Sequence, residues 1–244
     1  MWSWHIWVWV DDLTPVTITN KTGVNYNILP VNLASKWDAN TNGRIYNWFY
    51  QFGRPTPTLP PNRYNSNTDA ENYGDKTFEI KNTAISYKYG IMYPYTFYYN
   101  RSSPYLWYGG DKVYYNLWDA NCTSTGSSDN IVVKTVYDPC PVGFKMPNGN
   151  TFTYFSKVNV IGVFDYGWRF KRNADDTSGV FFPASGRRSY EDGDLTTVGS
   201  YSYVALSNMS SSKKIGSLRF DSSSVYPSND SIVANGCSVR PVQE

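Results

Sequence analysis

The chain has 244 residues, a formal net charge of +2 and 18% aromatic residues, including 22 Tyr and 9 Trp. Charged residues make up 17% of the sequence, against about 25% in an average soluble protein. The small net charge argues against a nucleic-acid-binding surface, and the single histidine, His5, excludes a multi-histidine zinc site. A surface poor in charge and rich in Ser, Thr, Asn, Gly and Tyr is typical of binding loops.

Short strands are expected along most of the chain. Residues 2–10 alternate in polarity and predict a buried strand that contains His5. Two short helices are expected, over 41–52 and over 81–91. In the first of them, aromatic residues stand at i, i+3 and i+4: Tyr46, Phe49 and Tyr50. With turns rich in Pro, Gly and Asn, and no charged linker, the pattern predicts a single domain over 1–244, either α+β or mostly β. We expect the α+β class.

The segment 199–237 differs in composition from the rest of the chain, because it is rich in Ser, Asn, Lys and Tyr. A strand is expected over 215–220, with Leu218 and Phe220 pointing inward and Ser217, Arg219 and Asp221 pointing outward. Polar loops without a role are the alternative interpretation. Regularly spaced apolar residues favour loops that are held in place by a core.

The sequence contains no pattern that indicates a cofactor or a metal. It lacks G-x-S-x-G, G-x-G-x-x-G and phosphate-loop motifs, and no run of 18 apolar residues predicts a membrane span. The acidic group 191–194 lacks the ligand ladder of a calcium loop, so a solvated turn is expected there. Cys122, Cys140 and Cys237 are compatible either with one disulfide and a free thiol or with three buried thiols.

Five blocks of sequence, taken together, carry a resemblance to a known family. They are Tyr50–Arg54, Tyr137–Pro147, Phe181–Arg187, Val225–Pro227 and Gly236–Val242. In this order they resemble the C-type-lectin-fold domains at the C-termini of Bacteroidetes surface and fimbrillin-associated proteins and of phage adhesins. That family overlaps with the variable proteins that diversity-generating retroelements diversify.

The resemblance implies a C-type lectin fold with mostly short antiparallel strands, few short helices and long irregular loops. In that fold the terminal strands pair, which would join the Trp-rich opening to residues 238–242. Variable positions would cluster near the C-terminus on an exposed face. The tripeptides that bind Ca²⁺ in animal lectins, Glu-Pro-Asn and Trp-Asn-Asp, do not occur here, so calcium-dependent sugar binding is not implied.

These observations favour a non-enzymatic ligand-binding domain, an adhesin or a receptor-binding domain, on a bacterial cell surface or a phage virion. Its partner would be a protein or a glycan on a cell surface, bound through the C-terminal segment. The residues expected to contact it are Tyr201, Tyr203, Ser207, Asn208, Lys213, Ser217, Arg219, Asp221, Tyr226, Asn229, Asp230, Ser231 and Asn235.

Two other functions remain as alternatives. A structural or pilus-tip assembly module would use the same face for permanent packing, and it should then present a contiguous apolar patch. Enzymatic activity is suggested only by the related fold of formylglycine-generating enzymes, whose chemistry needs reactive cysteines. Here Cys140 precedes Pro141 in an expected turn and Cys237 lies in the terminal strand, which disfavours catalysis.

Overall fold

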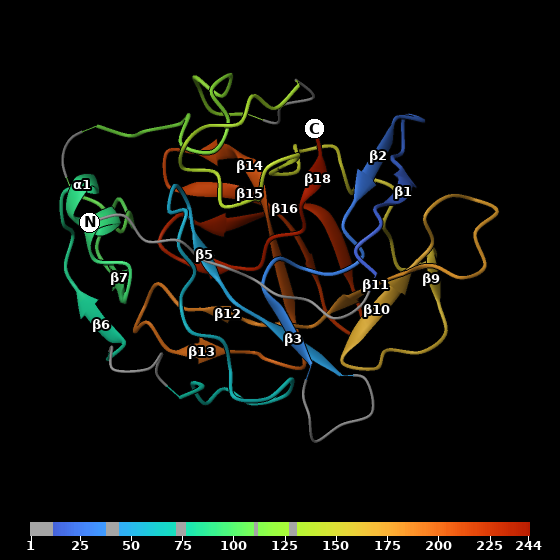
Figure 1. Cartoon of the computed structure of the whole chain (residues 1–244), viewed down its shortest axis with the longest axis horizontal. Helices are drawn as coiled ribbons and strands as arrows, with labels where there is room; N and C mark the ends of the chain where they lie inside the picture. The colour runs from blue at the N-terminus through green and yellow to red at the C-terminus, as the bar shows by residue number, and fades with distance from the viewer. Residues whose placement is uncertain (1–11, 38–43, 72–76, 110–111, 127–130) are drawn as a thin grey trace.

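The computed structural model describes residues 12–37, 44–71, 77–109, 112–126 and 131–244 (Figure 1). Within these ranges the chain is 37% strand and 3% helix. The expected α+β class is therefore wrong, and the described chain is built almost entirely from several small β-sheets. The predicted strand over 2–10, with His5, lies outside the described residues.

The helix expected over 41–52 is replaced by strands in its described part. β4 (Ile45–Asn47) pairs with β3 (Ser35–Trp37), and β5 (Tyr50–Gln51) pairs with β17 (Gly236–Cys237). All five residues of β4 and β5 are buried. A short apolar run that is buried on both sides cannot be told from a helix by its spacing, and aromatic side chains fit a buried strand well.

The prediction of a helix over 81–91 is correct only for residues 87–91. Helix α1 begins at Tyr87 and ends at Met92. The preceding residues form β6 (Glu79–Asn82), which pairs in parallel with β7 (Thr96–Tyr99). Parallel neighbours need a crossover connection, and α1 lies within this one.

The longest strands form an antiparallel sheet of three, coloured orange to red in Figure 1. They are β14 (Ser202–Ser211), β15 (Lys214–Phe220) and β16 (Val225–Ile232). Successive side chains of a strand point to opposite faces. Accordingly, Tyr203 and Ala205 of β14 belong to one hydrophobic core, whereas Val204 and Leu206 belong to a second.

This two-sided burial corrects part of the prediction for residues 215–220. Leu218 and Phe220 are fully buried, as expected. Ser217, which was expected to point outward, is also fully buried. It pairs with Ala205 of β14 and with Asn229 of β16, so the core that contains Ala205 covers its side of the sheet.

Aromatic rings fill both cores. In the first, the Phe52 and Trp118 rings meet edge to face at 4.9 Å. In the second, Phe155 stacks on Phe170 with ring centroids 4.5 Å apart. Large rings bury much apolar area per residue, which lets short strands and long loops enclose continuous cores. Much of the aromatic excess of the sequence is therefore explained by side chains that fill the two cores.

The remaining strands form two four-stranded sheets and one three-stranded sheet. The first has the order β1-β2-β18-β8, the second β13-β12-β17-β5 and the third β11-β10-β9. Their bounds are β1 (Val16–Thr19), β2 (Asn25–Ile28), β8 (Phe144–Lys145), β9 (Val160–Ile161), β10 (Gly167–Phe170), β11 (Val180–Pro183), β12 (Arg187–Arg188), β13 (Leu195–Thr196) and β18 (Val242–Gln243).

The C-terminal strand pairs with a strand near the beginning of the described chain. Val242 lies opposite Ile28 of β2 and Lys145 of β8. The pairing expected between 238–242 and the Trp-rich opening involves residues outside the described ranges, so it stays a prediction.

Arg240 is fully buried and binds two separate segments, the loop at 29–32 and strand β11. Its Nε donates to Asn32 Oδ1 at 2.8 Å, its Nη1 to the Pro30 carbonyl at 2.7 Å and its Nη2 to the Phe181 carbonyl at 2.9 Å. The guanidinium also lies 3.8 Å from the centroid of the Phe182 ring. Buried backbone carbonyls need donors, and a planar fork of five N–H groups supplies several at once.

Arg54 and Arg188 have the same role elsewhere and are also fully buried. Arg54 donates to Gln51 Oε1 at 2.9 Å and to the Thr96 carbonyl at 2.7 Å. Burial lowers the pKa of Arg54 to about 10, so the group is still charged at neutral pH. Arg188 binds the carbonyls of Leu59 and Gly193 and pairs with Asp69.

Replacing Arg240 by Met should lower the free energy of unfolding by about 3 kcal/mol or more, because each buried acceptor left without a donor costs about 1 kcal/mol or more. Arg240→Lys should also destabilise, since an ammonium cannot reach in three directions as a planar fork does. Urea unfolding measures both. Arg169→Met, at an exposed position of β10, is the control and should change stability by less than about 0.5 kcal/mol. Equal small effects at both sites would contradict this role.

Candidate functional site

The thirteen residues expected to contact a ligand divide into two groups by burial. All lie on β14, β15 and β16, in the turns that follow them or, for Tyr201, directly before β14. Six are buried: Tyr203, Ser207, Asn208, Ser217, Ser231 and Asn235. Seven are exposed or half-buried: Tyr201, Lys213, Arg219, Asp221, Tyr226, Asn229 and Asp230.

The buried group makes internal contacts. Asn235 accepts the Tyr190 backbone N–H at 2.9 Å and donates to Ser231 Oγ at 3.1 Å. Asn208 donates to the Gly126 carbonyl at 2.9 Å. These side chains fasten neighbouring loops to the sheet, and a bound partner would not reach them without moving those loops.

The exposed group lies toward the two ends of the sheet. Arg219 and Tyr226 are paired in register, and Tyr201 directly precedes β14 at the same end. Toward the other end, Lys214 Nζ lies 3.4 Å from Asp230 Oδ2. The Tyr201 end therefore holds the aromatic residues of the predicted set, and the other end holds an exposed ion pair.

At the Tyr201 end, two arginines lie against three tyrosines. We call the residues Arg187, Tyr201, Arg219 and Tyr226 the arginine–tyrosine surface; the Tyr203 ring, against which Arg187 lies, is buried. The Arg219 guanidinium lies 5.2 Å from the Tyr201 ring centroid and 5.5 Å from that of Tyr226. Arg187 lies 4.8 Å from the Tyr203 ring, which in turn stacks on Tyr201 at 6.4 Å. Cation–π contacts of this kind hold a guanidinium in place without using its N–H donors.

Arg187 joins this surface through a glycine turn. Gly186 has a φ of 70°, and a Cβ atom there would lie 2.4 Å from the Thr196 carbonyl oxygen, so a larger residue would not fit. The Gly186 N–H donates to the Tyr201 carbonyl at 2.7 Å. This bond sets β12 beside the start of β14 and brings Arg187 to Tyr203.

Both arginines of the surface have unused donors. Among the described residues neither forms an ion pair, and the Nε atoms of both are buried without a hydrogen-bond partner. The nearby Asp221 carboxylate accepts the backbone N–H groups of Ser223, at 2.7 Å, and Ser224, at 2.9 Å, through Oδ1, and it attracts Arg219 without forming an ion pair. A guanidinium group that forms no ion pair is the kind of group that can bind an anion.

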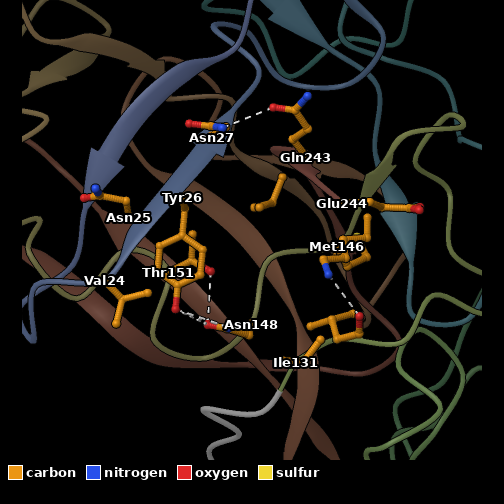
Figure 2. Close-up of a pocket in the computed structure, with 13 residues that line it drawn as sticks. Val24, Asn25, Tyr26, Asn27, Ile131, Met146, Asn148, Thr151, Gln243 and Glu244 are labelled. Carbon is orange, nitrogen blue, oxygen red and sulfur yellow. Dashed lines mark hydrogen bonds between the residues drawn. The ribbon is translucent and has the colours of Figure 1, made fainter.

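Cavities also lie outside the arginine–tyrosine surface, and two of them are large enough to compare. The larger, of about 300 Å³, is bordered by β2, β8, β18 and the turn at 148–151 (Figure 2). The smaller, of about 70 Å³, includes the predicted residues Asn208, Asn229 and Asp230 in its lining. It is well below the size of typical small-molecule sites, which begin at about 300 Å³.

Comparisons with protein-family models, curated proteins and solved structures found no match. The function must therefore be argued from the geometry. Across the described ranges, no helix has the length and apolar character needed to cross a membrane.

Of the residues in the arginine–tyrosine surface, sequence reasoning missed Arg187. It stands at the end of the block Phe181–Arg187, where Gly186 is followed by two arginines, Arg187 and Arg188. This basic pair after a glycine could have indicated a candidate binding residue. Its closeness to Tyr203 depends on the bridge between Gly186 and Ser202. Such a long-range pairing leaves no local pattern in the sequence.

The three cysteines are free and buried, which decides between the two thiol states left open by the sequence. Burial raises the pKa of the Cys237 thiol to about 11, and it also raises the pKa of Cys122 and of Cys140. The thiolate is the reactive form, so these groups are protonated and unreactive at neutral pH.

A thiol reagent such as DTNB should therefore react with no cysteine of the native protein at about pH 8 within minutes. In guanidinium chloride all 3 should react, and the unfolded Cys237→Ala variant should show one fewer. Release of the coloured thiolate measures both. A rapidly reacting thiol in the native protein would contradict the burial of the cysteines.

Proposed function

We propose that this protein is a non-enzymatic ligand-binding domain, an adhesin or receptor-binding domain of a bacterial surface or a phage virion. It binds an acidic patch of a protein or glycan through the arginine–tyrosine surface. The observation that carries this proposal is that two guanidinium groups lie on tyrosine rings, and neither forms an ion pair with a carboxylate among the described residues.

The composition of this surface suits recognition. Tyr and Arg are enriched at binding hot spots, and tyrosine provides contact area at low cost in conformational entropy. Tyr226 is 46% exposed, so its ring is available to a partner. Because both arginines are already held against rings, little further ordering is needed when an anion binds.

Diversification of the exposed positions is part of the proposal. The seven exposed or half-buried predicted residues lie toward the sheet ends. The other six are buried, and Asn208 and Asn235 among them hold neighbouring loops. Substitution at the exposed positions would alter the partner while leaving the internal contacts intact. The resemblance of the sequence blocks to retroelement-diversified proteins supports this interpretation. Diversification itself stays a prediction.

An assembly module is the second candidate, and one observation favours it. In the order β14-β15-β16, strand β16 is an edge strand among the described residues, and an exposed edge can pair with a strand of another subunit. Pro227 interrupts β16 and lacks the N–H that such pairing uses. A mass measurement in solution separates the candidates: self-association through β16 would favour assembly.

The double variant Arg187→Gln/Arg219→Gln should weaken binding to acidic ligands by about tenfold or more, which corresponds to about 1.4 kcal/mol or more. The probes are arrays of sialylated, sulfated and neutral glycans and of acidic peptides. Wild-type binding should favour acidic probes and weaken as salt is added. The midpoint of thermal unfolding should stay close to that of the wild type.

The matched control is Arg63→Gln/Arg169→Gln, which removes the same charge from two exposed positions elsewhere. It should retain binding. Equal losses in the two double variants would show a general charge effect, and absence of binding to every acidic probe would contradict the proposal.

A further inference from the structure

The sheet β14-β15-β16 ends at the outer edge of β16, with which no strand of the described ranges pairs. Alternate residues of an antiparallel strand direct their backbone N–H and C=O groups toward the neighbouring strand and away from it. Val233, which directly follows β16, donates its N–H to the Lys213 carbonyl at 3.0 Å. Odd-numbered residues after Pro227 therefore face β15, and the even-numbered ones face outward: Ser228, Asp230 and Ile232.

The outward N–H groups of these three residues have no acceptor among the described residues. Two of the outward carbonyls are occupied, because that of Asp230 accepts the Asn229 side chain at 2.9 Å and that of Ile232 accepts the Asn235 N–H at 2.9 Å. Ser228 and Asp230 are exposed and Ile232 is half-buried. The edge thus offers a row of hydrogen-bond donors to another molecule.

This row of donors begins beside the arginine–tyrosine surface. Tyr226 stands two residues before Ser228 on the same strand and lies opposite Arg219 of β15. The Arg219 guanidinium lies 5.5 Å from the centroid of the Tyr226 ring. A chain that lay along the edge of β16 would therefore bring one of its ends close to an arginine that forms no ion pair.

We propose that the partner is a protein that adds an extended segment to the edge of β16 and places an acidic side chain against Arg219. This inference rests on the proposed function, because the acidic side chain binds to the arginine–tyrosine surface. It deepens that function by naming a protein partner and the way in which it binds.

The spacing of the donors suits an extended peptide. The outward N–H groups of β16 recur at every second residue, which is about 6.6 Å along a strand. An extended peptide presents carbonyl groups on one side at the same interval, so three successive carbonyls can accept the N–H groups of Ser228, Asp230 and Ile232. Such strand addition takes its affinity from backbone hydrogen bonds and its specificity from side chains. The hydroxyl groups of a glycan have no matching repeat.

The charges along the edge determine where the acidic side chain lies. Asp230 belongs to the edge itself, and its carboxylate lies 3.4 Å from Lys214 Nζ. Like charges directly opposite each other on paired strands are destabilising, so the residue opposite Asp230 is expected to be uncharged or basic. The acidic side chain belongs at the end of the segment that reaches Arg219.

The test is NMR on the full chain with synthetic peptides. The probe is an acetylated and amidated peptide of alternating Thr and Val with two Glu at one end, prepared in both chain directions. One direction should bind with a Kd of about 0.1 mM. Amide hydrogen exchange of Asp230 and Ile232 should slow on binding, whereas that of Asn229 and Ser231, which already pair with β15, should not change.

Two kinds of peptide control separate the backbone from the charge. Methylation of the peptide nitrogens at one set of alternate positions should abolish binding, and methylation of the other set should not, because only one set faces the edge. Replacing both Glu by Gln should weaken binding by about tenfold.

Matched protein variants test the acidic contact. Arg187→Gln/Arg219→Gln should bind the acidic peptide as weakly as the wild type binds the peptide with Gln. Arg63→Gln/Arg169→Gln, with the same loss of charge at exposed positions elsewhere, should bind like the wild type. Circular dichroism and thermal unfolding verify that each variant is folded.

Acidic probes that bind while the Asp230 and Ile232 amides exchange as before would overturn this inference and leave the proposed function standing. Equal binding of both methylated peptides, or binding of acidic glycans alone, would also overturn it. Slower exchange that depends on protein concentration without peptide would assign the edge to a second copy instead. If no acidic probe of any kind bound, the proposed function would fail as well.

Discussion

The donation of buried arginine N–H groups to loop carbonyls is the interaction on which this architecture depends. A chain with short strands and long connections has many carbonyls that no strand partner satisfies. Arg54, Arg188 and Arg240 each reach two of them. Each guanidinium also lies on an aromatic ring. The aromatic residues and the arginines thus work together: rings fill the space between loops, and guanidinium groups bind the loop backbone.

The same pair of residue types has another role at the surface. Arg187 and Arg219 also lie on aromatic rings, yet their guanidinium groups lack the carbonyl partners that Arg240 has. The difference comes from position, because the buried arginines are enclosed by loops and these two lie toward the end of the sheet β14-β15-β16. With a hydrophobic core on each face, that sheet gives them a rigid support. An anion from another molecule can supply the missing acceptors.

The sequence predicted correctly those features that depend on the local pattern of apolar and polar residues. The alternation at Leu218 and Phe220 predicted the strand and its apolar side correctly. The prediction failed where pairing with a distant segment determines the secondary structure or the burial of a residue. Tyr46 and Tyr50 have helical spacing but lie in strands because β3 and β17 pair with them. Ser217 is polar yet buried because the sheet is covered on both faces, and Arg187 reaches Tyr203 only through a long-range bridge.

The central claim is that internal contacts hold the fold while the exposed residues at the sheet ends are free to change. The most direct measurement is protease resistance of two displayed libraries. One randomises Tyr201, Lys213, Arg219, Asp221, Tyr226, Asn229 and Asp230, and the other randomises Tyr203, Ser207, Asn208, Ser217, Ser231 and Asn235. We expect most members of the first library to stay folded and most members of the second to be cleaved. Equal survival of the two libraries, or greater survival of the second, would contradict the account.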